Sequence, residues 1–344
     1  MIQFANLPAQ ERELYFRQTA ILLSLPPHLI EKDFWVCFVL RLLFSIESVS
    51  PHLTFKGGTS LSKVFKAIHR FSEDIDFAVS RDGLGFGGKH APDEPGLSWS
   101  VREKRLQELG HKCRDWTRDE LLPTFNEKLH QSLPGLSWSI DLIEDSNQNQ
   151  QVLFRYPPSA ITLSNSYNPS TVRVELTART DNHPASNAIV RSYVAEQIEG
   201  AIDDPDVHVV VLKAERTFWE KATILHQLHF LENPERLPAG YSRHYYDVYQ
   251  LVREGFSRSA MSDMQLLPEV ADHKRVYYRQ GWARYDLARN PQTLELLPNL
   301  KIETHLKRDY ELMQEMIFRS PPTFDEIIQT LKSLKNEVNE KQLS

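Results

Sequence analysis

The sequence predicts an α+β protein, and two observations support this class. Before about residue 205, short runs in which polar and apolar residues alternate stand between helical segments. After that point the apolar residues recur mainly at helical spacing. We therefore expect a mixed sheet flanked by helices in residues 1–205, followed by a mainly helical domain in residues 206–344.

The chain is expected to begin with two helices. Residues 8–24 have a helical pattern, which Pro26-Pro27 interrupts. Residues 28–46 then form a longer helix with a broad apolar face. Three charged residues, Glu31-Lys32-Asp33, lie near its start, and we expect them to form a solvated first turn.

A glycine pair connects the first two predicted strands. Residues 53–55 form a strand that enters Gly57-Gly58, residues 60–69 form a helix, and residues 75–79 form the next strand. Glycine lets backbone N–H groups approach a phosphate closely, and a helix N-terminus favours negative charge. The order strand, glycine turn, helix, strand is therefore typical of a phosphate-binding unit.

Two acidic residues accompany the second of these strands. Asp74 and Asp76 are two positions apart, so their side chains lie on the same face of a strand. Two carboxylates beside a phosphate-binding turn favour a site for Mg²⁺ and a nucleotide. An isolated Asp-x-Asp would more often be a solvated strand end. Because a glycine turn and a helix precede it here, we favour a functional site. Ser72 and Arg70 contact phosphate or shape the turn.

The segment after this unit is expected to be a loop and then helix. Residues 81–98 contain a formal G-x-G-x-x-G, but prolines and acidic residues follow it instead of a helix. We interpret it as a flap and not as a dinucleotide site. Residues 100–129 are expected to form one or two helices. Further strand-like runs follow, at residues 136–143, 151–156, 160–163, 171–177 and 207–212.

Three more residues are candidates for chemistry. Glu175 lies on the polar face of its strand, either as a third metal-binding acid or as a surface glutamate beside Arg173. Lys221 falls within the apolar stripe of its helix and reaches a cleft or extends to solvent. Asp247 lies in an aromatic-rich helix, where it acts in catalysis or is a buried structural acid paired with Arg243.

Composition excludes several classes of protein. A net charge of −6 excludes a bulk polyanion binder, so nucleic acid would need a local basic surface. Two cysteines are too few for a disulfide framework or a cysteine metal site. No signal peptide or membrane-length apolar run is evident. A cytoplasmic protein without membrane contact is expected.

The combined motifs resemble those of a known family. Lys56-Gly-Gly-Thr-Ser-Leu-Ser-Lys63, Arg70-x-Ser-x-Asp-x-Asp76, Trp219-Glu-Lys-Ala222 and Tyr246-Asp-Val-Tyr249 occur in one order. They resemble the AbiEii/AbiGii nucleotidyltransferase toxins, which include the MenT toxins. The glycine and Asp-x-Asp blocks are shared with the broader polymerase-β-like minimal nucleotidyltransferase fold. The later helices narrow the resemblance to the toxin family, over roughly residues 28–255, with Glu31-Lys-Asp-Phe-Trp35 near its start.

The resemblance implies a Mg²⁺-dependent (or Mn²⁺-dependent) nucleotidyltransferase that uses a nucleoside triphosphate. Asp74 and Asp76 would hold the metal, with Glu175 as a third ligand, and Lys221 and Asp247 would complete catalysis from the helical domain. Lys213 is the alternative to Lys221. The residues implied to bind the nucleotide are Lys56, Gly57, Gly58, Thr59, Ser60 and Ser72.

The resemblance also implies biological partners. Toxin members are paired with an antitoxin from a neighbouring gene, and some add nucleotides to the 3′ end of tRNA. We therefore expect the toxin of a type IV-like, phage-defence system. Two alternatives stay open: an enzyme of this fold that modifies a protein or a small molecule, and a module that binds nucleotides without catalysis.

Overall fold

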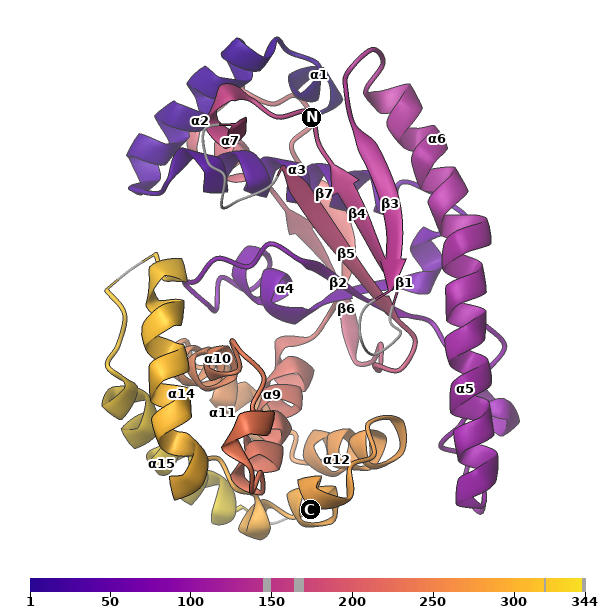
Figure 1. Cartoon of the computed structure of the whole chain (residues 1–344), viewed down its shortest axis with the longest axis vertical. Coiled ribbons are helices and arrows are strands. Elements are labelled where there is room, and N and C mark those ends of the chain that lie inside the picture. Colours follow the sequence, from indigo (N-terminus) through magenta and orange to yellow (C-terminus); the bar gives the residue numbers. More distant parts are fainter. Residues whose placement is uncertain (145–149, 164–169, 319, 342–344) are drawn as a thin grey trace. The chain divides into compact units, whose positions relative to one another are not determined.

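The computed structural model describes residues 1–144, 150–163, 170–318 and 320–341 (Figure 1). The chain divides into two compact units. We call the first, Met1–Val64, Ser72–Ala91 and Glu103–Val211, the sheet unit. The second, Phe65–Phe71, Pro92–Arg102 and Leu212–Ser344, is the helical unit. Two short segments of the N-terminal half thus belong to the helical unit. The change from strand-rich to helix-rich sequence near residue 205 does not predict this.

The sheet unit is built on a seven-stranded mixed sheet in the order β3-β4-β5-β2-β1-β7-β6. Strand β2 lies at its centre, antiparallel to β1 and parallel to β5, while β1 is also parallel to β7. The predicted mixed sheet is confirmed. The strands are β1 Leu53–Lys56, β2 Ile75–Val79, β3 Ser139–Glu144, β4 Gln150–Arg155, β5 Thr171–Thr177, β6 Ala185–Val190 and β7 Val207–Leu212.

Two strand assignments differ from the sequence prediction. Ala160–Leu163, expected as a strand, forms the short helix α7, and Glu31 binds the backbone N–H of Ser159 just before it. Ala185–Val190, not expected as a strand, forms β6 at the end of the sheet order. Most of its residues are at least partly exposed, so it lacks the buried alternation that identifies strands from sequence.

Helix α3, Pro27–Phe44, packs against the sheet (Figure 1). It is buried on nearly every side, as expected for a core helix. Trp35 stacks on Tyr156, with ring centroids 5.3 Å apart, and also contacts Phe154 of β4. The other helices that begin in or belong to this half are α1 Ile2–Ala5, α2 Ala9–Leu23, α4 Gly57–Lys63, α5 Trp99–Trp116, α6 Leu122–Ser132 and α8 Tyr193–Gln197.

Helix α4 is shorter than the predicted helix over residues 60–69. It begins at Gly57 and ends at Lys63. Lys66 has a φ of 52°, which an α-helix cannot accommodate. The apolar residues beyond Lys63 serve the helical unit instead, where Phe65 packs against Phe256 with ring centroids 5.9 Å apart.

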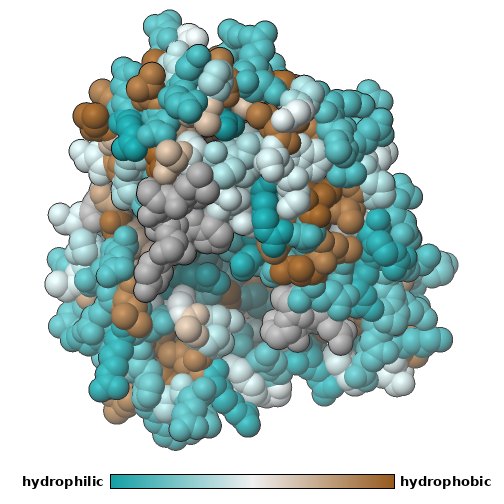
Figure 2. Space-filling view, turned by 45° about the horizontal axis from the view of Figure 1, so that its top comes forward, coloured by the Kyte–Doolittle hydropathy of each residue, from teal (hydrophilic) through white to brown (hydrophobic). Residues whose placement is uncertain are grey.

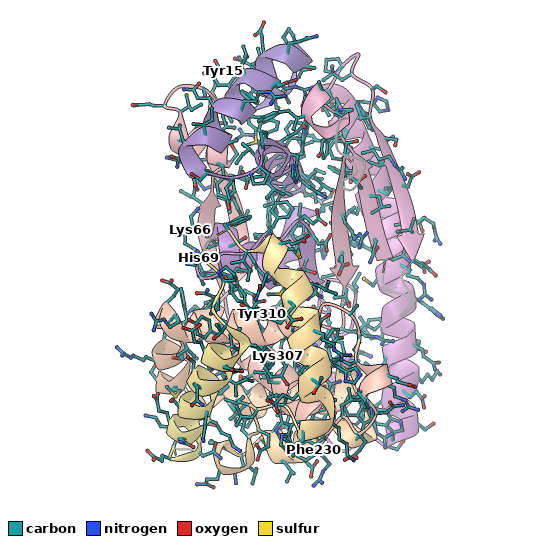
Figure 3. All side chains as sticks on the ribbon, turned by 60° about the vertical axis from the view of Figure 1, so that its left-hand side comes forward. Tyr15, Lys66, His69, Phe230, Lys307 and Tyr310 are labelled. Atoms are coloured by element: carbon teal, nitrogen blue, oxygen red, sulfur yellow. The ribbon has the colours of Figure 1, made fainter. Side chains whose placement is uncertain are left out.

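The helical unit is organised around α9, Ala214–His229, which packs against α10, α11 and α12. Its last helix begins with a capping box, because Thr323 and Glu326 each bind the other's backbone N–H. Tyr310 of α14 is buried and donates to the Pro322 carbonyl at 2.7 Å (Figure 3). The remaining helices are α10 Ser242–Arg253, α11 Phe256–Ser262, α12 Leu266–Tyr277, α13 Tyr285–Ala288, α14 Leu300–Met313 and α15 Phe324–Asn339.

The surface is mostly hydrophilic on the face that Figure 2 displays, where hydrophobic side chains gather in small groups. Within the described parts of the chain, no helix combines the length and the hydropathy that crossing a bilayer requires.

Candidate active site

Three carboxylates lie together on the central strands of the sheet unit. Asp76 of β2 and Glu175 of β5 are register partners in a parallel pair, and Asp74 immediately precedes β2. The Glu175 carboxyl group also makes a hydrogen bond with the Asp76 side chain. Arg173, on the same face of β5, has its Nε 3.9 Å from Asp74 Oδ1. The register thus brings together acids that are about a hundred positions apart in the sequence.

The clustering of these acids changes their pKa values. Burial raises the pKa of Glu175 to about 7, and the neighbouring charges of Asp76 and Asp74 add to the effect while Arg173 opposes it. Burial and Asp76 raise the pKa of Asp74 to about 6, again opposed by Arg173. Like-charged groups held this close favour a cation or a proton between them. This is the behaviour expected of a cluster that binds a cation.

Gly57 allows Asp76 to approach the start of α4. Its φ is 80°, a conformation that side chains other than glycine rarely adopt. A Cβ at this position would lie 1.9 Å from Asp76 Oδ2, which is far inside van der Waals contact. The first glycine of the predicted turn is therefore required because it packs directly against a carboxylate of the cluster.

The hydroxyl groups of the glycine stretch bind within the protein. Thr59 is buried and donates to the Asp74 carbonyl, and its hydroxyl also forms a hydrogen bond with the Ser72 hydroxyl at 3.0 Å. Ser60 is buried and donates to the Gly57 carbonyl at 2.9 Å. Lys56 is half-buried and is the register partner of Asp76. These hydroxyls shape the turn around the acids, and nucleotide binding by this stretch stays a prediction.

The expectation that Glu31, Lys32 and Asp33 form a solvated turn is wrong. All three are buried, and each binds a different segment of the sheet unit. Glu31 accepts hydrogen bonds from the Ser159 backbone and hydroxyl, at 2.8 and 2.9 Å. Lys32 forms an ion pair with Glu73, the residue before Asp74. One turn of α3 therefore supports the chain that leads into the acid cluster.

Asp33 binds both the end of α4 and the start of α8. Its Oδ1 accepts from Lys63 Nζ at 2.5 Å, and its Oδ2 accepts from the Tyr193 backbone N–H at 2.6 Å. Lys63 Nζ also lies 3.8 Å from the centroid of the Tyr193 ring. Burial disfavours the charged form of Lys63, but the Asp33 carboxylate outweighs it and holds the lysine pKa above its ordinary value.

In the helical unit, Lys221 and Asp247 are brought together with Arg70. Arg70 binds both Asp247 oxygens, each at 2.8 Å, and Lys221 Nζ donates to Oδ2 at 2.7 Å. Asp247 is fully buried, and the two cations hold its pKa below the ordinary range against the effect of burial. The ion-pair partners of Asp247 are therefore Arg70 and Lys221, and the sequence-based suggestion of Arg243 is wrong. Arg70 thus pairs with Asp247, and contact between Arg70 and phosphate stays a prediction.

The lysine in this cluster is also unusual. Burial and Arg70 lower the pKa of Lys221, and Asp247 opposes that shift. The placement of Lys221 within the apolar stripe of its helix agrees with its burial. The catalytic roles of Lys221 and Asp247 stay predictions, and the geometry adds that they form one charged group with Arg70.

Donor chemistry at the acid cluster fits a hard divalent cation. Carboxylate oxygens are the ligands that Mg²⁺ and Mn²⁺ prefer. Among the described residues, no three His, Cys, Asp or Glu side chains are already arranged around a single ion position. Mg²⁺ is commonly held by one or two carboxylates together with substrate phosphates. Asp74 and Asp76 therefore fit a cation that arrives with a nucleotide.

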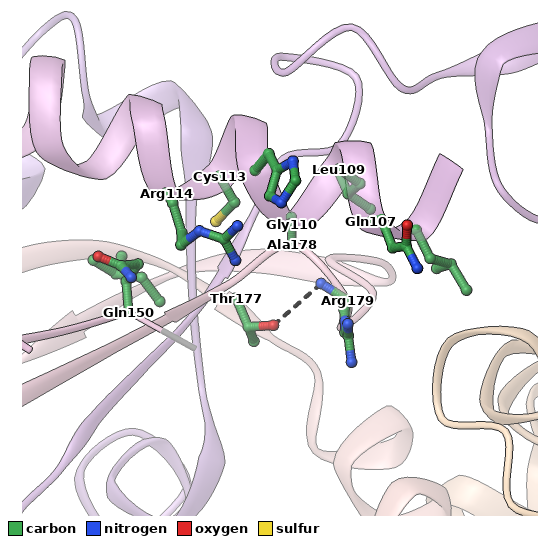
Figure 4. Close-up of a pocket in the computed structure, with 12 residues that line it drawn as sticks. Gln107, Leu109, Gly110, Cys113, Arg114, Gln150, Thr177, Ala178 and Arg179 are labelled. Carbon is green, nitrogen blue, oxygen red and sulfur yellow. Dashed lines mark hydrogen bonds between the residues drawn. The ribbon is translucent and has the colours of Figure 1, made fainter. Parts of the chain in front are cut away.

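A separate pocket lies between α5 and strands β4 and β5 (Figure 4). Leu176 and Gln150 line it from the sheet, and Leu109 and Cys113 line it from the helix. Side chains alternate along a strand, so Leu176 points to the face opposite Glu175. Burial raises the pKa of Cys113 to about 11, which leaves its thiol protonated and unreactive at neutral pH. This pocket is therefore distinct from the acid cluster.

Sequence reasoning missed two contributors to the cluster's surroundings. Lys32 lies in a motif that was noted, but its burial was not expected. Gln151 of β4 donates to Glu175 Oε1 at 3.0 Å, and nothing in the local sequence marks it. Only the pairing of β4 with β5 brings Gln151 to Glu175, so the missing signal was strand register.

Similarity to known proteins identifies the family to which the chain belongs. No curated protein matches the sequence. The solved structure of MenT4, a nucleotidyltransferase toxin from Mycobacterium tuberculosis H37Rv, is similar over 98% of this chain and 99% of its own, with 15% identity and a TM-score of 0.40. That likeness is distant, and no residue is assigned from it. The family model described as "Nucleotidyl transferase AbiEii toxin, Type IV TA system" matches residues 40–330. The chain is therefore a nucleotidyltransferase that belongs to the AbiEii toxin family of type IV toxin–antitoxin systems.

Proposed function

We propose that the protein transfers a nucleoside monophosphate from a nucleoside triphosphate to an acceptor hydroxyl at the Asp74–Asp76–Glu175 cluster. The observation that carries this proposal is the register of β2 and β5, which sets Glu175 beside Asp76 on one face of the sheet. The raised pKa values of Asp74 and Glu175, about 6 and 7, support a cluster built to receive a cation.

Each residue of the cluster has a proposed task. Asp74 and Asp76 hold the divalent cation, Mg²⁺ or Mn²⁺, and Glu175 is its third ligand. When bound, that cation neutralises phosphate charge and lowers the pKa of the attacking hydroxyl. Gly57 keeps the Asp76 carboxylate against the start of α4. The backbone N–H groups of the glycine stretch, with Lys56, receive the triphosphate.

The reaction itself is an in-line displacement at the α-phosphorus. A bond forms between the acceptor oxygen and phosphorus while the bond to pyrophosphate breaks, and pyrophosphate leaves. Positioning and electrostatic stabilisation supply most of the rate in such transfers. The chain's own contribution is therefore the fixed placement of its carboxylates by β2 and β5.

For the acceptor we propose the 3′ end of tRNA, which rests on the family resemblance. The proposed partner is an antitoxin from a neighbouring gene, and the proposed setting is phage defence, on the same basis. Co-expression with the product of that gene should restore growth if expression of this chain arrests it. Growth arrest that is unchanged by the neighbouring gene would contradict the proposed pairing.

The function is tested by incubating the purified protein with labelled nucleoside triphosphates, Mg²⁺ and total tRNA. We expect label in RNA with the wild-type protein and none above background with Asp76→Asn. Label in protein or in a small molecule, identified by mass spectrometry, would instead support a different acceptor. Tight nucleotide binding without any transfer would support a non-catalytic module and overturn the proposal.

A further inference from the structure

Gln151 is a buried amide that directly contacts the acid cluster. Its Nε2 donates to Glu175 Oε1 at 3.0 Å, and only 7% of the residue is exposed. It lies at the start of β4, where it is the register partner of Glu175. A buried side-chain amide needs partners for its polar atoms, and here one partner is a carboxylate of the cluster.

Gln151, Glu175 and Asp76 form a row across three neighbouring strands. Glu175 is the partner of Gln151 on one side and of Asp76 on the other. Directly opposite side chains in adjacent strands share a face of the sheet, so all three groups lie on that face. The Glu175 carboxyl group is thus held between a neutral hydrogen-bond donor and a second carboxyl group.

The chemistry of an amide suits this position. Asp76 and Asp74 repel an ionised Glu175, and a donor on the far side stabilises the carboxylate where it stands. A lysine or arginine would also donate, but its positive charge would compete with a cation for the same carboxylate. A neutral amide fixes the orientation of Glu175 and leaves the net negative charge of the cluster unchanged.

We propose that Gln151 is a positioning residue of the nucleotidyl-transfer site, which orients Glu175 toward the divalent cation. The inference rests on the proposed function of the acid cluster and adds a residue to it. Gln151 acts through Glu175 and does not itself contact the reacting atoms. It resembles the hydrogen-bonded partners that orient ligands in many metal sites.

The chain contains a matched control on the same strand. Gln150 is also buried and donates its Nε2 to a glutamate, Glu144, at 2.8 Å. It precedes Gln151 by one position, so its side chain lies on the opposite face of the sheet. Replacing either glutamine by methionine keeps the side-chain length and removes the donor. Only the Gln151 change removes a contact to the acid cluster.

The test uses the full chain and two readouts. Mn²⁺ binding is measured by electron paramagnetic resonance with an α,β-methylene nucleotide, and transfer is measured as kcat and KM. For Gln151→Met we expect Mn²⁺ affinity and kcat each to fall about 10- to 100-fold, because removing such a partner has effects of that size. KM for the nucleotide should change little, and Gln150→Met should leave all of these values near wild type.

A double-mutant cycle separates positioning from simple destabilisation. Once Glu175→Gln is present, Gln151→Met should cause no further loss of Mn²⁺ affinity or kcat, because its effect passes through Glu175. If Gln151→Met does not fold, which a thermal melt reveals, Gln151→Leu replaces it in the same cycle.

Two results would overturn the inference. One is Gln151→Met matching Gln150→Met in Mn²⁺ affinity and kcat, and the other is additive losses in the cycle. Failure of the underlying function has a different signature, since Asp76→Asn would then leave Mn²⁺ affinity at the wild-type value. A protein in which Asp76→Asn weakens Mn²⁺ binding and Gln151→Met does not would retain the function and lose only the role of Gln151.

Discussion

Asp33 of α3 holds Lys63 of α4 by a buried ion pair, with Oδ1 and Nζ 2.5 Å apart. Both side chains are almost fully buried, so neither charge is compensated by water. Burial and pairing together make this contact sensitive to the loss of either partner. It fixes the end of the helix whose first residue packs against Asp76.

We predict that Asp33→Asn lowers the free energy of unfolding by about 3–5 kcal/mol, because it leaves the Lys63 charge buried without a counter-charge. Urea unfolding followed by circular dichroism measures the change. Glu108→Gln is the control, since it removes an exposed pair with Lys104 at 3.8 Å. That change should stay within about 1 kcal/mol. Equal effects of the two variants would mean that Lys63 finds another partner or reaches water.

Gly57→Ala should abolish transfer while the protein still folds. The alanine Cβ would collide with Asp76 Oδ2 and displace that carboxylate from the cluster. Gly85→Ala is the matched control, because Gly85 has a φ of 85° but nothing within 4 Å of an added Cβ. Both variants carry the strain of a left-handed residue, about 1–2 kcal/mol. Full activity in Gly57→Ala would show that Asp76 does not need its present position.

The raised pKa values of Asp74 and Glu175, about 6 and 7, predict a fall in stability with rising pH in the metal-free protein. Between the unfolded and folded pKa values the folded state binds more protons, so its stability is highest at low pH and is lost as pH rises through about 6 to 7. Glu175→Gln should reduce this slope. Unfolding in urea at pH 5 and pH 8, for wild type and variant, checks it. Identical slopes would mean that Glu175 does not titrate in this range.

Lys221→Met should separate catalysis from stability in the helical unit. Asp247 would keep its two hydrogen bonds from Arg70, so the buried charge would stay compensated. We expect near-normal melting and a loss of transfer of about 10²–10³-fold, the range for removal of one group that stabilises developing charge.

Asp247→Asn provides the contrast, because it leaves Arg70 and Lys221 without a carboxylate. It should destabilise the protein by about 3–5 kcal/mol. Wild-type rates in Lys221→Met would remove Lys221 from catalysis and leave Lys213 as the candidate.

The acids and the central strands could be predicted because their signals are local. Asp74 and Asp76 follow a glycine pair at short range, and Glu175 lies on a strand with clean alternation. The family was also predictable from four motif blocks, and the match over residues 40–330 confirms it. The strands and the family need no knowledge of which segments pair in space, whereas the position of Glu175 beside Asp76 depends on the pairing of β5 with β2.

The rest depends on contacts that sequence periodicity does not report. The sequence predicts a solvated turn at residues 31–33. In the structure all three side chains are buried, and each binds a partner from a distant segment. Apolar residues continue at helical spacing beyond Lys63, but the helix does not. Phe65 packs instead against Phe256 in the helical unit. Such partners are set by strand register and chain topology, which a single sequence does not specify.

The position of β2 between β1 and β5 has a consequence for synthesis of the chain. Strand β5 ends at Thr177, and β7, the other neighbour of β1, ends at Leu212. A growing chain therefore cannot complete its central sheet until Leu212 has left the ribosome. Such non-local parallel pairings also form slowly. Translation that stops before β5 yields a fragment without Glu175 and with the edge of β2 unpaired, so truncated products are predicted to be inactive and prone to aggregation.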